Sequence, residues 1–110
     1  GEVQGRTCII VDDMIDTGGT ICKAADALFE AGAADVVVTA THGVLSDPAL
    51  DRLKNSQLTK VVITDTLPLD DDRRIDKIEV LSVAGIIADA LDAVFEDLSV
   101  SEIFGGENQA

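Results

Sequence analysis

The segment from Ile9 to Thr20 reads IIVDDMIDTGGT, and the interpretation of the whole sequence starts from it. It begins with a run of β-branched residues, which is typical of a buried strand. Two aspartates follow the run directly, and a Thr-Gly-Gly-Thr turn comes shortly after them. The segment therefore predicts a strand, a tight turn and a helix whose first backbone amides are left without partners.

The turn has the chemistry of an anion site. We expect Gly18 and Gly19 to adopt positive φ angles and to let a ligand approach the bare backbone. Thr17 and Thr20 add hydroxyl donors. Because the helix dipole also favours an anion at this end, the turn is suited to one phosphate monoester and requires no lysine.

The acidic residues admit two interpretations. Asp12 and Asp13 can accept hydrogen bonds from the vicinal hydroxyls of a sugar, or face a hydrated Mg²⁺. The spacing from Asp12 to Thr17 fits the distance between a sugar's ring hydroxyls and its 5-phosphate. Alternatively, Asp16 and Thr17 cap a helix while the other two aspartates are a solvated strand end. The residues alone leave both interpretations open.

The length and composition indicate one small globular domain. The chain has 110 residues, of which 46% are hydrophobic, and its formal net charge is −13. This charge argues against nucleic acid or an anionic membrane surface as a partner. No apolar run approaches the roughly 18 residues of a transmembrane helix. Cys8 and Cys22 have no metal-ligand spacing and are expected to be reduced thiols, which favours a cytoplasmic protein.

The pattern along the chain predicts an α/β fold. Four short runs rich in β-branched residues lack a clean polar alternation, so each should be a strand buried on both sides. These runs are Thr7–Val11, Asp35–Thr41, Lys60–Thr64 and Ile78–Val83. Helical patterns lie between most of them, which predicts one parallel sheet with helices on both faces. The polar residues after each strand would then gather at one rim of the sheet.

Three helices are expected from apolar spacing and end signals. The first carries a stripe from Ile21 to Ala31, with Gly32 as its C-terminal cap. In the second, Asp47 is the expected N-cap and Pro48 the first helical residue. The third carries a stripe from Ile87 to Leu98. The acidic and basic segment Leu69–Arg74 reads as a solvated loop.

The assembled motif resembles the phosphoribosyl-diphosphate fingerprint of type I phosphoribosyltransferases. Four segments, GRTCIIVDDMIDTGGTICKAADAL, THGVLSDPA, VVITDTLPL and SVSEIF, resemble in that order the C-terminal part of ribose-phosphate pyrophosphokinases, also called phosphoribosyl-diphosphate synthetases. The resemblance covers essentially the whole chain. It implies that residues 1–98 are part of a phosphoribosyltransferase-like domain, truncated on its N-terminal side, and that residues 99–110 form a C-terminal tail.

The resemblance also implies an activity. That family transfers the diphosphoryl group of ATP to ribose 5-phosphate, with Mg²⁺ as cofactor and inorganic phosphate as activator. The residues matched to ribose 5-phosphate binding are Asp12, Asp13, Asp16, Thr17, Gly18, Gly19 and Thr20. The family's ATP-binding residues, its metal ligands and its catalytic lysine lie upstream, so we expect no catalytic residue and no metal ligand in this segment. The segment alone should therefore be inactive.

Further expectations follow from the same resemblance. The family assembles as hexamers, and its effector site between subunits matches the tail residues Ser99, Ser101 and Phe104. Ser99 and Glu102 also have the spacing of a capping box, so a cap alone is an equal alternative. His42 is expected to be a hydrogen-bonded loop residue, with a supporting role near the sugar as the alternative.

Three other functions share parts of this pattern. A receiver domain of two-component signalling also has an acid pair after its first strand, but it needs a lysine after its last strand, which is missing here. A salvage phosphoribosyltransferase would use the same fingerprint to bind phosphoribosyl diphosphate. A non-catalytic associated subunit would keep the sugar-phosphate loop and regulate a partner enzyme, and this sequence leaves that alternative open.

Overall fold

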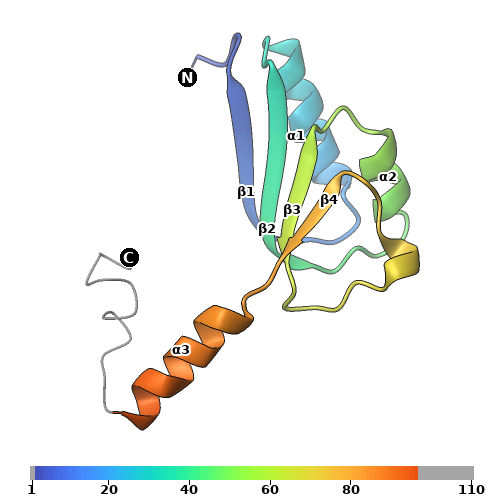
Figure 1. Cartoon of the computed structure of the whole chain (residues 1–110). Coiled ribbons are helices and arrows are strands. Elements are labelled where there is room, and N and C mark those ends of the chain that lie inside the picture. Colours follow the sequence, from blue (N-terminus) through green and yellow to red (C-terminus); the bar gives the residue numbers. More distant parts are fainter. Residues whose placement is uncertain (1, 97–110) are drawn as a thin grey trace.

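A single parallel sheet organises the molecule. The computed structural model describes residues 2–96, in which four strands lie in the order β1-β2-β3-β4 (Figure 1). The strands are β1 (Thr7–Ile15), β2 (Asp35–Gly43), β3 (Lys60–Thr64) and β4 (Ile78–Leu81), and every neighbouring pair is parallel. The predicted α/β class with a parallel sheet is therefore confirmed.

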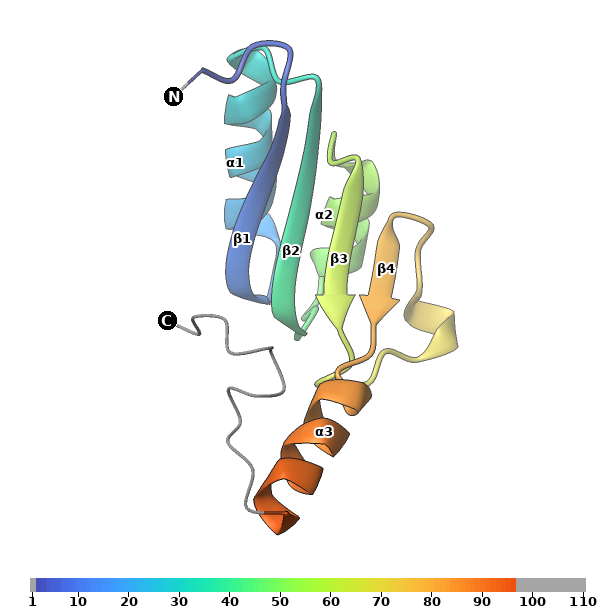
Figure 2. The ribbon, with the colours of Figure 1, turned by 60° about the vertical axis from the view of Figure 1, so that its left-hand side comes forward.

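The core lies on one side of this sheet. Alternate residues of β2 and β3, such as Val36, Val38 and Ile63, are almost completely buried, because successive side chains of a strand point to opposite faces. The helices α1 (Gly19–Glu30) and α2 (Ala49–Asn55) cover this face together (Figure 2). These β-branched side chains and the leucine and alanine residues that face them form the apolar core between sheet and helices.

The expectation of helices on both faces was wrong for the described residues. Ile9 and Val11 of β1 lie on the other face and are 65% and 76% exposed. The strand order explains the difference. Each right-handed crossover steps to the next strand in the same direction, so both crossover helices come to lie on the same face.

Helix α1 ends in a Schellman motif, as Gly32 predicted. Gly32 has a φ of +100°. Its N–H donates to the carbonyl of Phe29, and the N–H of Ala33 donates to the carbonyl of Leu28, both at 3.0 Å. This pairing satisfies carbonyls that a helix end otherwise leaves without partners.

Helix α2 begins one residue later than the sequence indicated. Pro48, not Asp47, precedes its first residue Ala49, and the N–H of Ala49 donates to the carbonyl of Ser46 at 2.9 Å. This tight turn takes the place of an aspartate cap. The other end of α2 is capped from a distant part of the chain, where Lys77 Nζ donates to the carbonyl of Leu53 at 2.8 Å.

The connection from β3 to β4 is anchored more firmly than a solvated loop. It contains a short 3₁₀ helix, Asp71–Arg73. Leu69 packs against the core, and the guanidinium of Arg73 donates to the carbonyl of Leu45. The prediction of a solvated loop therefore holds for the exposed acidic side chains of this segment, and it missed the contacts of Leu69 and Arg73 with the rest of the fold.

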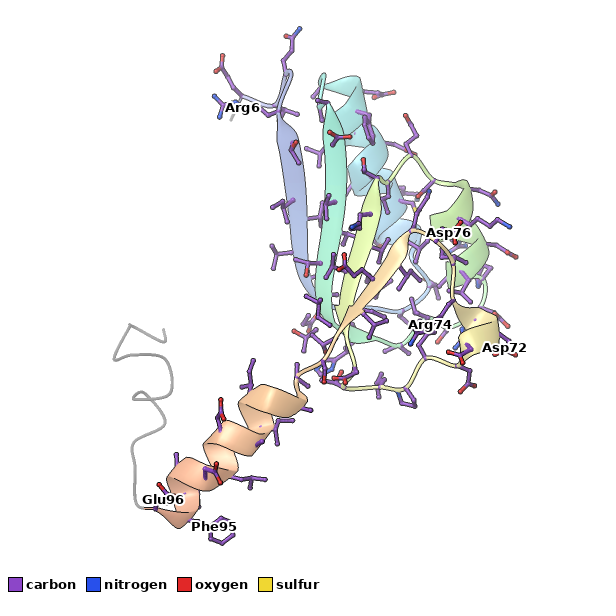
Figure 3. All side chains as sticks on the ribbon, viewed as in Figure 1. Arg6, Asp72, Arg74, Asp76, Phe95 and Glu96 are labelled. Carbon is purple, nitrogen blue, oxygen red and sulfur yellow. The ribbon has the colours of Figure 1, made fainter. Side chains whose placement is uncertain are left out.

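Helix α3 (Ala84–Phe95) extends away from the sheet beyond the end of β4, and Phe95 points outward from it (Figure 3). Strand β4 ends at Leu81, two residues before the predicted end at Val83. The predicted end of the last helix at Leu98 and the proposed effector residues Ser99, Ser101 and Phe104 lie outside the described residues. None of the helices in residues 2–96 is long and apolar enough to cross a membrane.

Candidate functional site

Strand β1 carries the acidic residues to the carboxyl rim of the sheet. It continues to Ile15, four residues beyond the predicted end at Val11, because Asp12 still pairs with Ala40 and Ile15 with Gly43. Ile15 is fully buried and fixes the end of the strand. The strand tip is thus held by pairing with β2 and by the buried Ile15, while Asp12, Asp13 and Met14 are exposed.

The turn after β1 leads directly into α1. Gly18 is the N-cap with a φ of +80°, and its carbonyl accepts the first helical hydrogen bond, from Cys22 N–H at 3.0 Å. Across residues 2–96, no side chain caps this helix and no acidic residue lies in its first turn. The first-turn amides therefore remain available for an anion, as the sequence predicted.

Gly19 differs from the expectation. Its φ is not positive, so the turn requires only one left-handed residue, Gly18. A Cβ at Gly19 would instead lie 3.0 Å from the guanidinium nitrogen Nη1 of Arg52. A side chain at this position would therefore crowd the end of the Arg52 side chain.

The turn and the strand tip enclose a small hollow of about 240 Å³. Its lining residues are Asp12, Met14, Asp16, Thr17, Gly18, Gly19, Thr20 and Ile21. The structure therefore brings together every predicted ribose 5-phosphate residue except Asp13. The N–H of Asp13 donates to Asp12 Oδ1 at 2.7 Å, which orients the Asp12 carboxylate.

Two lining residues, Met14 and Ile21, were not predicted. Met14 is 45% exposed and pairs in register with His42, whereas Ile21 is 6% exposed. They were missed because the fingerprint singles out polar residues and glycines. They give the hollow an apolar part beside its polar residues.

A cation lies closer to the turn than the sequence suggested. Nη1 of Arg52 donates to the carbonyl of Thr17 at 3.2 Å. A second, larger hollow of about 600 Å³ lies between α1 and α2, and Lys23, Asp26 and Arg52 line it together with Thr17. No sequence pattern links Arg52 to the turn, because 35 positions separate it from Thr17.

Cys22 lines the larger hollow as well. Its Sγ lies 3.8 Å from the carbonyl oxygen of Arg52. Partial burial raises the pKa of this thiol above its ordinary value. The Cys22 side chain is therefore a protonated neighbour of α2 at neutral pH.

The other rim residues are joined by hydrogen bonds. Nδ1 of His42 lies 2.7 Å from Oγ1 of Thr66, and the Thr64 hydroxyl donates to the carbonyl of Thr41 at 2.6 Å. His42 is thus hydrogen-bonded, as expected, but it lies in the last residues of strand β2, opposite Met14, and not in a loop. In the part of the chain that the structure describes, no three His, Cys, Asp or Glu side chains form a group that could hold a metal ion.

Asp65 at the end of β3 joins this strand to the start of α3. Its Oδ1 accepts a hydrogen bond from the N–H of Val83 at 2.9 Å. This bond, with a smaller contribution from Ser82, holds the pKa of Asp65 below its usual value. The Asp65 carboxylate is thus engaged in a structural contact. In addition, β1 lies at the edge of the described sheet, whereas the first strand of a receiver domain lies between two neighbours. Both observations argue against a receiver domain.

Comparison with known proteins places this geometry in a family. Residues 1–105 match the model of the phosphoribosyl synthetase-associated domain. The ribose-phosphate pyrophosphokinase of Streptomyces avermitilis is 64% identical over 104 residues, which are 94% of this chain and 32% of that protein. The enzyme of the same name from Clostridium acetobutylicum is 55% identical over 107 residues, which are 97% of this chain and 34% of that protein.

A solved structure agrees with these matches. The crystal structure of phosphoribosylpyrophosphate synthetase from Mycobacterium smegmatis superposes with a TM-score of 0.84 at 52% identity, over 88% of this chain and 33% of that one. The chain thus spans about a third of the length of the Streptomyces and Clostridium enzymes. Since the family model matches nearly all of the sequence, the chain belongs to the phosphoribosyl synthetase-associated domain family.

Proposed function

We propose that this chain is the ribose 5-phosphate-binding part of a ribose-phosphate diphosphokinase, which transfers the diphosphoryl group of ATP to ribose 5-phosphate and releases AMP. The observation that carries the proposal is the hollow at the start of α1, where uncapped amides and two threonine residues adjoin the carboxylate of Asp12. The names of the similar proteins support this activity.

The two ends of the sugar would meet different groups. The 5-phosphate would accept hydrogen bonds from the amides and hydroxyls of Thr17–Thr20, which are neutral donors and need no lysine. The carboxylate of Asp12, which lines the hollow, would accept hydrogen bonds from the ribose hydroxyls, and Asp13 would meet them from outside the hollow. This arrangement explains how a chain with a net charge of −13 can hold a phosphate, because the donors act at contact distance.

The remaining parts of the reaction belong to the rest of the protein. We place this chain in the C-terminal portion, with residues 1–98 in a phosphoribosyltransferase-like domain and residues 99–110 as a tail. The ATP site and the catalytic lysine would lie upstream, in the two thirds of the relatives' length that this chain does not cover. The open face of the sheet around Val11 is where we expect that remainder to pack, so the chain alone should have no turnover.

We also propose that Mg²⁺ binds together with the substrate, as the cofactor of the reaction. Asp12 and Asp13 would offer the oxygen ligands that Mg²⁺ prefers, and further ligands would have to come from the diphosphate and from the rest of the protein, because the described residues contain no group of three ligands. When bound, Mg²⁺ neutralises charge on the group that is transferred. Activation by inorganic phosphate, a hexameric assembly and a cytoplasmic location are proposed on the resemblance alone.

A regulatory subunit without catalysis is the alternative, and it would have the same hollow. The enzyme and the regulatory subunit differ in turnover. If the proposed function is right, the whole protein should form phosphoribosyl diphosphate and AMP from ATP and ribose 5-phosphate. A whole protein that binds the sugar phosphate without forming either product would be the regulatory subunit.

Calorimetric titration of the chain with ribose 5-phosphate, ribose and inorganic phosphate tests the binding step. We expect ribose 5-phosphate to bind more tightly than either fragment, because the hollow holds both of its ends. Thr17→Val, which removes one hydroxyl at nearly constant shape, should weaken binding several-fold. The matched control is Thr59→Val, since the Thr59 hydroxyl donates to Asp35 at the opposite end of the sheet. Equal affinities for ribose 5-phosphate and phosphate would contradict the assignment of the carboxylates.

A further inference from the structure

We propose that Arg52 is a positioning residue that fixes the Thr17–Thr20 turn from behind and turns its amides toward the ligand. The inference rests on the proposed function for the identity of that ligand. Its structural basis is the hydrogen bond from Arg52 Nη1 to the carbonyl of Thr17, at 3.2 Å. This contact joins α2 to the turn across a large separation in sequence.

The direction of this hydrogen bond matters for the site. The peptide between Thr17 and Gly18 is trans, so its carbonyl and its N–H point in opposite directions. Because the carbonyl points to Arg52 on the α2 side, the N–H of Gly18 points away from α2. Gly18 lines the small hollow beside Asp12, so Arg52 directs an amide donor toward the proposed phosphate position.

Helix α2 supports the turn with one face. Ala49, Arg52 and Leu53 lie at the spacing that brings side chains together on a helix. A Cβ built at Gly18 would lie 3.8 Å from both Ala49 Cα and Leu53 Cδ2, which is ordinary contact. Apolar atoms therefore support Gly18, and the guanidinium supports the residues on either side of it.

Gly19 is the partner of Arg52 in this arrangement. Its φ is ordinary, but a Cβ there would meet Arg52 Nη1 at 3.0 Å. A side chain at position 19 would therefore press on the guanidinium, which would have to shift by a few tenths of an ångström from its place beside the Thr17 carbonyl. The close approach of Arg52 favours a residue without a side chain at position 19, whereas the conformation of the turn does not require one.

The backbone of α2 is held firmly enough for Arg52 to act in this way. Lys77 Nζ donates to the carbonyls of Leu53 and Ser56 at 2.8 and 2.7 Å. Both Ala49 and Leu53 are fully buried. The helix is thus fixed at both ends, and the Arg52 side chain adds a polar contact with the turn to the apolar contacts of Ala49 and Leu53.

The test compares Arg52→Ala with Lys54→Ala, which removes an equal charge from the same helix at a residue that lines a different hollow. Without ligand, Arg52→Ala should shift the amide resonances of Gly18 and Gly19 and lower their NMR order parameters. It should also weaken ribose 5-phosphate binding by about three- to tenfold, as expected for one exposed charge-assisted hydrogen bond. Lys54→Ala should do neither.

Gly19→Ala provides an independent check. It should reproduce the effects of Arg52→Ala, and the double variant should be little worse than either single one. Weaker binding with unchanged Gly18 and Gly19 resonances in the ligand-free protein would overturn the proposal, because Arg52 would then contact the ligand directly. Unchanged resonances and unchanged binding would overturn it too. If the unmodified chain fails to bind ribose 5-phosphate, the proposed function fails, while the ligand-free spectra still decide the role of Arg52.

Discussion

At the scale of single residues, Gly18 and Gly19 are glycines for different physical reasons. Gly18 has a φ of +80°, a conformation that costs other residues energy because Cβ approaches the backbone. Gly19 has an ordinary φ and instead leaves room for Arg52. The same dipeptide therefore combines a backbone requirement with a packing requirement.

The first prediction separates stability from binding. Gly18→Ala should lower the free energy of unfolding by about 1–2 kcal/mol, because the new residue must adopt positive φ. Gly5→Ala is the matched control, since Gly5 has a φ of +72° and open space around its Cβ position. Denaturant unfolding should show similar losses for both variants, whereas only Gly18→Ala should weaken ribose 5-phosphate binding. A Gly18→Ala protein with full affinity would contradict the proposed role of the turn.

The sequence predicted which polar residues gather at the rim of the sheet, and their role in binding stays a prediction. Asp12, Asp16 and the Thr17–Thr20 turn follow a β-branched run, and local rules suffice to place them at the rim. Arg52 could not be found in this way, because its contact with Thr17 depends on how α2 docks in three dimensions. From the sequence, the positive potential could therefore be assigned to backbone donors alone.

At the scale of elements, α2 depends on residues outside itself. It is a short helix, and such helices are marginal without tertiary contacts. Lys77, just before β4, donates to two carbonyls at its C-terminal end. A cation here also interacts favourably with the negative end of the helix dipole.

The second prediction concerns this cap. Lys77→Met keeps the length of the side chain but removes the donor, and it should lower the free energy of unfolding by about 1–3 kcal/mol. Thermal or denaturant unfolding measures the change. Lys54→Met, on the exposed side of α2, is the control and should be within about 0.5 kcal/mol of the unmodified chain. Equal stability of the two variants would show that the Lys77 cap is not needed.

The third prediction concerns pH. The pKa of Asp65 is held below its usual value of 3.8 by the N–H of Val83, so this contact stabilises the fold above that value and is lost as the pH falls through the lowered pKa. In an NMR titration, the Val83 amide should shift at a pH below the usual aspartate range. Asp65→Asn should abolish this step. A midpoint at or above the usual aspartate pKa would contradict the structural role of the contact.

The strands show where local sequence is sufficient. The run Lys60–Thr64 was predicted with the bounds that β3 has, because its β-branched residues stop where pairing stops. Strand β1 was predicted too short, since Asp12, Met14 and Ile15 pair with β2 although the pattern of this segment is not apolar. The prediction that helices cover both faces of the sheet was also wrong for the described residues. A run of apolar residues indicates that a strand is buried, but it does not show whether a helix of the same chain or another part of the protein covers it.

At the scale of the whole molecule, one face of the sheet and much of α3 remain open in residues 2–96. Val11, Ile87 and Phe95 are 76%, 54% and 84% exposed. Apolar surface of this kind usually marks an interaction site. It agrees with the proposal that this chain is about a third of a longer enzyme.

The fourth prediction tests that open face. The chain alone should bind a hydrophobic fluorescent dye, and Val11→Thr should reduce the binding while keeping a β-branched residue in the strand. A full-length relative, such as the Streptomyces avermitilis enzyme, should bind much less dye per molecule. The same measurement on Ile86→Thr, a substitution on α3, shows how much of the dye binds to the helix and how much to the sheet. Similar dye binding by the chain and the full-length relative would contradict the idea that the remainder covers this face.

The central claim is that backbone donors at the start of α1 bind the phosphate while the neighbouring carboxylates face the sugar. Amide NMR during a titration with ribose 5-phosphate tests it most directly. The account predicts shifts concentrated in Asp12–Ile21, with the amides of Gly18 and Gly19 among the most affected. Unmoved resonances in that segment, or shifts confined to the larger hollow around Asn55–Gln57, would contradict it.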